Sequence, residues 1–322
     1  STSDSGLKEF LKTKSGNSAD MNLLLVRMLK EADFDAVPVV LQTRQKGFLN
    51  VSLPSLANLN YVIAELKLNG KVFYLDCTDK NLPFGYLPSK VNNIYAVRIE
   101  DEIGTKFELK NPNKASTVRV ATLKFLENRL VGTRQSRFSK ISAYQKRMWL
   151  NEIQSDERRL TAIQGEDKKV KIKSCEYTIP ESDDKPIACL ELIDFTSYIQ
   201  SADDKLFIPI MLGMGFEENP FEAKTRNFSV FFDNQEIDKV SVIIDIPEGY
   251  TVESAPKPFA IALEGREIEC QLNTTILKDK LIVNYSFRRN VTIIYPNLYS
   301  SLVKLYDSII EHSNQQIVLL KT

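Results

Sequence analysis

The sequence has 322 residues, of which 43 % are apolar and 26 % charged, as is ordinary for a soluble protein with a packed core. Its 42 lysine and arginine residues equal its 42 aspartate and glutamate residues, so it lacks the basic excess typical of nucleic-acid binding. No apolar run reaches the ~18 residues that a membrane-spanning helix needs. The length predicts two or three domains.

The first part of the chain predicts two helices. A short helix is expected at residues 7–11. A stronger helix follows the loop around Gly16, because apolar residues recur at i, i+3, i+4 and i+7 spacing from residue 21 to residue 32. This second helix is apolar nearly all round. We therefore expect it to be buried, with Asn17 or Ser18 as its N-cap.

An antiparallel sheet is predicted after these helices. Short strands are expected at residues 36–41, 60–68 and 72–75, and Asn69-Gly70 between the last two is a hairpin signal. The buried helix and this sheet predict an α+β domain over residues 1–112.

Residues 113–322 are typical of a β-rich domain. A hairpin is predicted from residues 118–123 and 129–134 around Glu127-Asn128, followed by one helical insertion at about residues 140–163. Further short strands, separated by turn residues, favour a sandwich-like arrangement; they are predicted at residues 170–177, 188–193, 206–210, 228–232, 240–246, 259–263, 268–272 and 281–287. A further division near residue 220 is considered. The chain is expected to end in an amphipathic helix that begins at Pro296 and docks on the β domain.

The four cysteines show no metal-site spacing. None forms a CxxC or CxH pattern, so no zinc site is expected, and no other metal or cofactor is predicted. If the strands at residues 170–177 and 187–193 pair antiparallel, Cys175 faces Cys189. Lys173 then faces Glu191. Both a disulfide and the packing of two small apolar side chains remain open for the cysteine pair.

Three short motifs follow one another along the first part of the chain. Gly16-Asn17-Ser18 precedes the buried helix, Asn60-Tyr61-Val62 lies in a strand, and Leu75-Asp76-Cys77-Thr78 ends the next strand. Their order, spacing and expected secondary structure resemble the transglutaminase-like (papain-like) superfamily over residues 15–95. In active members a cysteine, a histidine and an aspartate form a triad. The resemblance places Ser18 at the nucleophile position, Tyr61 at the base position and Asp76 at the orienting position.

Two of these three residues are replaced, and both replacements predict loss of catalysis. A serine hydroxyl is far less acidic than a thiol, so the helix dipole cannot ionise Ser18 near neutral pH. The phenol of Tyr61 has an ordinary pKa of about 10 and is protonated at pH 7, so it cannot serve as a base. We expect a self-satisfied polar cluster instead, in which Tyr61 donates to Asp76 and Ser18 caps its helix.

Two other residues are set aside as catalytic candidates. The single histidine, His312, is expected to be a solvated residue of the C-terminal helix. Cys77 directly follows Asp76, and adjacent strand residues point to opposite faces, so Cys77 is expected to pack in the core.

The second half of the chain also shows a resemblance. Asn219-Pro220-Phe221, Ile246-Pro247-Glu248-Gly249-Tyr250 and Gln316–Lys321 resemble the β-rich C-terminal region of a bacterial multidomain family. Its members usually carry an upstream β domain before the transglutaminase-like core, and they are typically exported to the periplasm or cell surface. The resemblance implies the same location for this chain. Neither the upstream domain nor the opening helices of the core are recognisable, so we expect an N-terminally truncated core.

We therefore expect a catalytically inactive binding or assembly module of the bacterial envelope. Its former cleft would hold a peptide or a glycan, flanked by aromatic residues such as Phe73, Tyr74 and Phe84, or the module would bind another envelope protein. The alternative is a residual hydrolase or acyltransferase in which Ser18 uses another base, for example Asp20 or a partner's side chain. A purely structural part of a larger complex is the third hypothesis.

Overall fold

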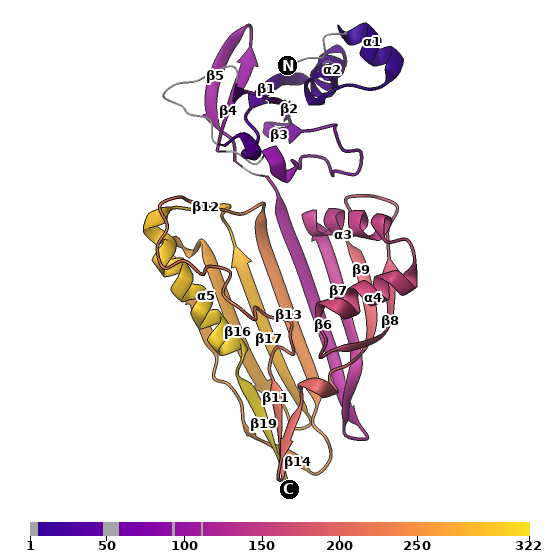
Figure 1. Ribbon diagram of the computed structural model, residues 1–322, viewed down its shortest axis with the longest axis vertical. Coiled ribbons are helices and arrows are strands. Elements are labelled where there is room, and N and C mark those ends of the chain that lie inside the picture. The colour runs from indigo at the N-terminus through magenta and orange to yellow at the C-terminus, as the bar shows by residue number, and fades with distance from the viewer. Residues whose placement is uncertain (1–5, 48–57, 92–93, 111) are drawn as a thin grey trace. The chain divides into compact units, whose positions relative to one another are not determined.

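The computed structural model describes residues 6–47, 58–91, 94–110 and 112–322. The chain divides into two compact units, Ser1–Asn113 and Lys114–Thr322 (Figure 1). Both combine helices with mostly antiparallel strands, so the expected α+β class is confirmed. Within the described ranges no helix is long and apolar enough to cross a membrane.

The first unit is a five-stranded antiparallel sheet with the order β3-β2-β1-β4-β5, preceded by two helices. The helices are α1 Gly6–Thr13 and α2 Ser18–Glu31. The strands are β1 Asp35–Leu41, β2 Tyr61–Leu68, β3 Lys71–Leu75, β4 Tyr95–Glu100 and β5 Ile103–Glu108. Short 3-10 turns are η1 Arg44–Lys46 and η3 Ser89–Val91. The strands predicted at residues 36–41, 60–68 and 72–75 are thereby confirmed.

The β2–β3 hairpin forms where the sequence predicts it. Asn69 and Gly70 connect the two strands with φ values of 50° and 72°. Left-handed conformations at both positions match the right-handed twist of the flanking strands, and they are easiest for asparagine and glycine. The hairpin brings the end of β3 next to the start of β2.

Helix α2 buries only one side. Ala19, Asn22 and Val26 are its buried residues and recur at i, i+3 and i+7, whereas Met28 is 62 % exposed. The expectation of a helix buried all round is therefore wrong. Its apolar composition indicates how much surface could be buried, but within the described residues α2 packs along one stripe, against β1 and β2.

The two faces of this sheet have different partners. Ala64 and Leu66 of β2 pack with Val26 of α2. Tyr61 and Ile63 alternate with them, so they leave β2 on the opposite face. There they pack with Leu87 and Val91 from the segment between β3 and β4, which encloses the Tyr61 side chain.

The second unit is built on an eight-stranded sheet with the order β15-β16-β17-β13-β6-β7-β9-β8. Strands β6 and β13 are parallel, and the other neighbouring pairs are antiparallel. The strands are β6 Lys114–Leu126, β7 Arg129–Lys140, β8 Lys171–Thr178, β9 Ile187–Asp194, β13 Gln235–Asp245, β15 Phe259–Ala262, β16 Ile268–Ile276 and β17 Lys280–Arg289. The sheet thus takes strands from both sides of residue 220.

Two smaller sheets complete the strands of this unit. One has the order β10-β11-β19-β14 and the other pairs β12 with β18. Their bounds are β10 Gln200–Ala202, β11 Lys205–Pro209, β12 Val230–Phe231, β14 Tyr250–Ser254, β18 Ile293–Ile294 and β19 Gln316–Lys321. Ile208, Ile317 and Leu319 of the four-stranded sheet belong to the same core cluster as the large sheet. Sheet-on-sheet packing of the expected kind occurs here, while helices cover the rest of that face.

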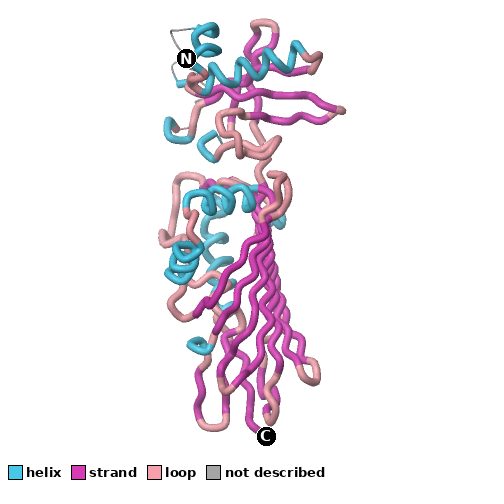
Figure 2. The backbone as a smooth tube through the Cα atoms, turned by 90° about the vertical axis from the view of Figure 1, so that its right-hand side faces the viewer, coloured by secondary structure: helices cyan, strands magenta, loops and turns pink. Residues whose placement is uncertain are grey.

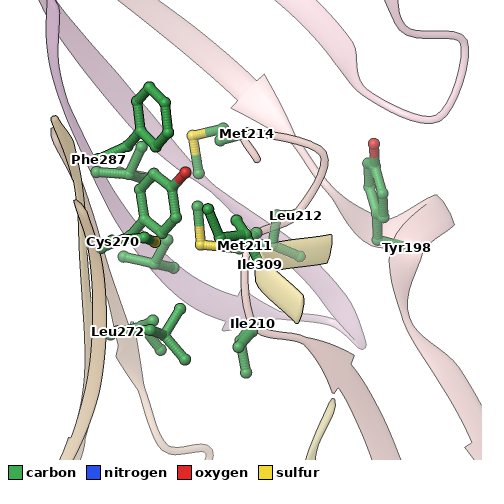
Figure 3. Close-up of a cluster of buried hydrophobic side chains, with 14 of the residues drawn as sticks. Tyr198, Ile210, Met211, Leu212, Met214, Cys270, Leu272, Phe287 and Ile309 are labelled. Atoms are coloured by element: carbon green, nitrogen blue, oxygen red, sulfur yellow. The ribbon is translucent and has the colours of Figure 1, made fainter. Parts of the chain in front are cut away.

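The helices of the second unit lie on one side of the large sheet (Figure 2). They are α3 Ile141–Glu152, α4 Asp156–Glu166 and α5 Tyr299–Ser313, with 3-10 turns η4 Thr196–Tyr198, η5 Glu264–Arg266 and η6 Pro296–Leu298. Between them and the sheet lies the apolar core of this unit. Figure 3 shows Met211 and Met214 beside Cys270 and Phe287 of the sheet, and Ile309 of α5.

Several details of the second unit differ from the sequence prediction. The single helical insertion is two helices, because Ser155 caps α4 by accepting a hydrogen bond from the Arg158 backbone. Pro296 begins a 3-10 turn rather than the C-terminal helix itself. That helix is not the last element either, since β19 follows it and joins the four-stranded sheet.

The pairing of β8 with β9 is antiparallel as predicted, but its register is wrong by two residues. Cys189 faces Tyr177, and Glu191 faces Cys175. An irregularity between Ile172 and Ser174 shifts the ladder. A shift of two residues keeps every side chain on its predicted face, so Cys175 and Cys189 still lie on the same face.

Candidate functional site

The N-terminus of α2 is capped by Asn17 and not by Ser18. Asn17 Oδ1 accepts hydrogen bonds from the backbone N–H groups of Ala19 and Asp20, and Asp20 Oδ2 accepts one from the Asn17 backbone at 3.0 Å. This reciprocal capping box satisfies the free donors at the helix start. Of the two residues predicted as possible caps, Asn17 is thus confirmed, while Ser18 occupies the first helical position and does not cap the helix.

Tyr61 and Asp76 are directly hydrogen-bonded. The Tyr61 hydroxyl donates to Asp76 Oδ2 at 2.9 Å, and the Thr78 hydroxyl oxygen lies 3.0 Å from the same phenol oxygen. The backbone N–H of Thr78 donates to Asp76 Oδ1 at 2.9 Å. The predicted hydrogen bond from Tyr61 to Asp76 is thus confirmed, and Thr78 extends it.

Asn22 joins this pair to helix α2. Its side-chain amide donates to Asp76 Oδ1 at 3.1 Å and to the Val62 carbonyl at 2.9 Å. Its carbonyl oxygen accepts from the backbone N–H of Cys77 at 3.0 Å. Asn22 is fully buried, so these bonds replace the water that its amide would otherwise need.

Cys77 takes part in the same cluster. Its Sγ lies 3.3 Å from Asn22 Oδ1, to which the thiol donates. Burial raises the pKa of this thiol, and the charge of Asp76 raises it further, so the sulfur is held as a neutral donor. The interpretation of Cys77 as simple core packing is therefore wrong, because a buried asparagine acceptor lies within reach of the thiol.

The electrostatics of Tyr61 keep it protonated. Burial is the main cause that raises its pKa, and the neighbouring charge of Asp76 acts in the same direction, while the Thr78 hydroxyl partly opposes them. A Lys90 ammonium group lies 4.8 Å from the centre of the Tyr61 ring. Tyr61 is consequently a hydrogen-bond donor at neutral pH and cannot accept a proton from a nucleophile.

Three members of the cluster are buried, while Cys77 and Thr78 are half-buried at its edge. The exposed fractions of Asn22, Tyr61 and Asp76 are 0 %, 6 % and 8 %. Ser18 is half-buried and lies one helical turn from Asn22, on the same side of α2. Within the described residues its hydroxyl makes no hydrogen bond to Tyr61 or Asp76. Of the three positions that the resemblance singles out, the structure therefore brings Tyr61 and Asp76 into direct contact and gives Ser18 no hydrogen bond to either of them.

The aromatic residues expected around one cleft are divided between two places. Phe73 and Phe84 form a tilted pair with ring centres 5.1 Å apart. Tyr74 instead stacks on Phe107 of β5 at 6.1 Å. Adjacent residues of β3 point to opposite faces of the sheet, so Phe73 and Tyr74 cannot flank the same cleft.

His312 is also not the solvated residue that the sequence suggested. Its ring stacks on Phe259 with a centroid distance of 3.7 Å, and its Nδ1 lies 2.8 Å from the Ser308 carbonyl oxygen. The imidazole thus packs between α5 and β15 within the second unit.

Sequence reasoning missed the role of Asn22 and of Thr78. The available signal for Asn22 was an amide side chain in an apolar helix, four residues after Ser18 and hence on its face. A polar residue at such a position needs a buried partner. Thr78 belonged to a recognised segment, but its hydrogen bond to Tyr61 depends on how β2 and β3 are aligned.

Comparisons with known proteins assign only part of the chain. Residues 204–319 match a family described as a domain of unknown function with a solved structure, DUF3858. The match begins at the start of β11 and ends in β19, so β6 to β9 of the large sheet lie outside it. No curated protein matches the sequence. The crystal structure of a candidate protease from Parabacteroides distasonis is similar over 98 % of this chain, with 13 % identity and a TM-score of 0.48. The alignment covers 46 % of that protein, so this chain spans less than half of its length.

Proposed function

We propose that this chain is a catalytically inactive, transglutaminase-like module that serves in binding or assembly. The observation that carries the proposal is the hydrogen bond from Tyr61 to Asp76, at the positions where active members of that superfamily have a histidine and its orienting aspartate. The Tyr61 phenol takes the place beside Asp76 that a histidine would have. It donates a hydrogen bond to the carboxylate, but it stays protonated near neutral pH and so cannot act as a base. The resemblance would place the module in the bacterial envelope.

The remaining polar groups support an inactive site. Asp76 accepts from Tyr61, Asn22 and the Thr78 backbone, so both of its carboxylate oxygens are already hydrogen-bonded within the cluster. Ser18 would need a base to become a nucleophile, because the helix dipole alone lowers a pKa by far too little for a hydroxyl. Asp20, the base considered for a residual hydrolase, is held by the Asn17 backbone in the capping box.

The burial of the cluster favours assembly over a ligand in the former cleft. A peptide or glycan would have to displace the segment that covers Tyr61, in which Leu87 and Val91 are both fully buried. We therefore propose that the module binds a protein partner through its outer surface, rather than a peptide or glycan at the covered Tyr61–Asp76 cluster.

The test is an activity assay with matched serine variants. Purified protein is incubated with glutamine-containing peptides and a primary amine, and with a fluorophosphonate that labels reactive serines. We expect no hydrolysis, no cross-linking and no labelling at Ser18. Product formation that Ser18→Ala abolishes and Ser15→Ala preserves would establish the residual hydrolase instead. Ser15 is an exposed residue just before the helix and serves as the control.

A further inference from the structure

Four side chains on β8 and β9 form a rectangle on the covered face of the large sheet. Cys175 and Tyr177 are alternate residues of β8, and Cys189 and Glu191 are alternate residues of β9. Cys175 is opposite Glu191, and Tyr177 is opposite Cys189. Alternate residues of paired strands share a face, so all four project to the same side.

Three of these side chains place metal-ligating atoms close together. The sulfur atoms of Cys175 and Cys189 are 3.2 Å apart, and both thiols are free. These sulfurs and a carboxylate oxygen of Glu191 all lie within 4.8 Å of one another. Cys189 and Glu191 are buried, with 4 % and 3 % exposure. Because the three residues lie on two different strands, they do not form a local CxxC or CxH pattern by which the sequence could reveal the site.

Two positively charged side chains, Arg134 and Lys146, lie near the two cysteines and Glu191. Arg134 of β7 binds Glu191 through both guanidinium arms, at 2.5 Å and 3.0 Å. Lys146 of α3 lies over the Phe138 and Trp149 rings, at 4.8 Å and 4.4 Å from their centres. Both cations line the same cavity as Cys189 and Glu191.

A cavity of about 360 Å³ opens onto this cluster. Cys189, Glu191 and Tyr177 line it, together with Arg134 and Lys146. An ion could enter through this space, and a water molecule or an external ligand could occupy a remaining coordination position.

We propose that Cys175, Cys189 and Glu191 bind one soft divalent cation of the zinc class. Tetrahedral coordination with metal–sulfur distances of about 2.3 Å separates two sulfur ligands by roughly 3.8 Å, so the thiols need to move apart only slightly. Arg134 stays on the outer lone pairs of Glu191 and orients this carboxylate, as partners of metal ligands commonly do. Binding replaces the two thiol protons, which are released to solvent, so affinity falls as pH falls.

Cys175 and Cys189 could instead be oxidised to a disulfide, and this reaction would compete with metal binding. An external disulfide would take up two electrons and both thiol protons, becoming two thiols, while one S–S bond forms between Cys175 and Cys189. A disulfide has no thiolate to offer a cation, so the two states exclude each other. The test is therefore made on fully reduced protein in a phosphine reductant that does not compete for the ion.

The experiment titrates the reduced chain with Cd²⁺ and with Zn²⁺. We expect one equivalent to bind, with the ultraviolet charge-transfer band of cadmium thiolate. Cys175→Ser and Cys189→Ser should each remove the band. Cys270→Ala should retain it, because Cys270 is buried among apolar side chains elsewhere in the same sheet.

A second measurement needs no variant. Alkylation with iodoacetamide, mapped by mass spectrometry, compares Cys175 with Cys77 in the same molecule. Bound Zn²⁺ should slow the alkylation of Cys175 by about tenfold or more and leave Cys77 unchanged. The proposal is wrong if the reduced wild-type chain binds neither ion, or if the bound ion protects Cys77 and not Cys175. These outcomes are independent of the serine assay, so either proposal can fail alone.

Discussion

The Tyr61 hydroxyl donates a hydrogen bond to Asp76 Oδ2 at 2.9 Å, and both side chains are at least nine-tenths buried. In this position the phenol supplies a donor to the buried carboxylate, and its raised pKa means that it is not a base near neutral pH. One residue therefore accounts both for the stability of the cluster and for its lack of basic character.

Tyr61→Phe should destabilise the first unit without changing its fold. The variant keeps the aromatic ring but leaves Asp76 Oδ2 and the Thr78 hydroxyl without this partner. We expect a loss of about 1–3 kcal/mol in the free energy of unfolding, measured by urea denaturation. Tyr74→Phe is the control, since its ring stacking on Phe107 does not depend on the hydroxyl. Equal stability of both variants would contradict the role given to the Tyr61 hydroxyl.

Introducing the cysteine and histidine that the proposed resemblance implies at positions 18 and 61 should lower the pKa of the new thiol. In Ser18→Cys combined with Tyr61→His, an imidazole held by Asp76 would stand near a thiol at the start of α2. We expect a thiol pKa about one unit or more below that of Ser18→Cys combined with Tyr61→Phe. The measurement is the pH dependence of alkylation at residue 18, read by mass spectrometry. Identical profiles for the two double variants would show that positions 18 and 61 do not meet as a triad.

Asp194 should make the second unit sensitive to acid. Burial raises the pKa of this carboxyl, but hydrogen bonds from Thr196 and Arg129 outweigh burial and lower the pKa from 3.8 to about 2. A lowered pKa in the folded state contributes stability above the unfolded value, and this contribution is lost as pH falls from about 4 to about 2.

Asp194→Asn removes this contribution. The wild-type chain should exceed the variant by about 2 kcal/mol at pH 6, and the margin should shrink towards pH 2. Denaturation at a series of pH values measures this difference. Asp245→Asn is the control, because the Asp245 side chain is 46 % exposed and its pairing with Lys280 is loose at 3.7 Å. A margin that stays constant with pH would contradict the assignment.

Gly132 should not tolerate a side chain. A Cβ atom at this residue of β7 would lie 1.9 Å from the Thr122 carbonyl oxygen of β6. The neighbour is backbone, so the two strands would have to separate. Gly132→Ala is expected to cost about 2 kcal/mol or more. Gly165→Ala, in α4 with open space around the new methyl group, should be neutral or stabilising by up to about 1 kcal/mol. Equal melting temperatures would contradict the close approach of β6 and β7.

Local signals predicted the hairpins well. Asn69-Gly70 and Glu127-Asn128 both connect paired strands, and all four residues have positive φ. The conformation of such turns is determined by a few adjacent residues and does not depend on contacts with distant parts of the chain. The break between α3 and α4 also had a local signal, namely Ser155 before two acidic residues, which the apolar pattern on either side obscured.

Pairing over longer distances was harder to predict. Cross-strand complementarity favoured Cys175 opposite Cys189, yet in the observed ladder Cys175 lies opposite Glu191, two residues away, and the irregularity after Ile172 contributes one residue of this shift. A shift by an even number of residues keeps each side chain on the same face of the sheet. The predicted face of Cys175 and Cys189 was therefore correct, whereas their predicted cross-strand partners were wrong. For the candidate site, the motifs located Tyr61 and Asp76, but the partners Asn22 and Thr78 follow from tertiary packing that one segment does not encode.

The parallel pairing of β6 with β13 has a consequence for how the chain is made. Gln235 pairs with Lys114, so this contact closes a loop that contains most of the second unit. The hairpin of β6 with β7 can form early, whereas loop-closure entropy delays the strand that covers the other edge of β6. Until β13 emerges from the ribosome, β6 presents an unpaired edge, and such edges recruit strands from other chains. The interval between the synthesis of β6 and that of β13 is therefore when this protein is most exposed to aggregation.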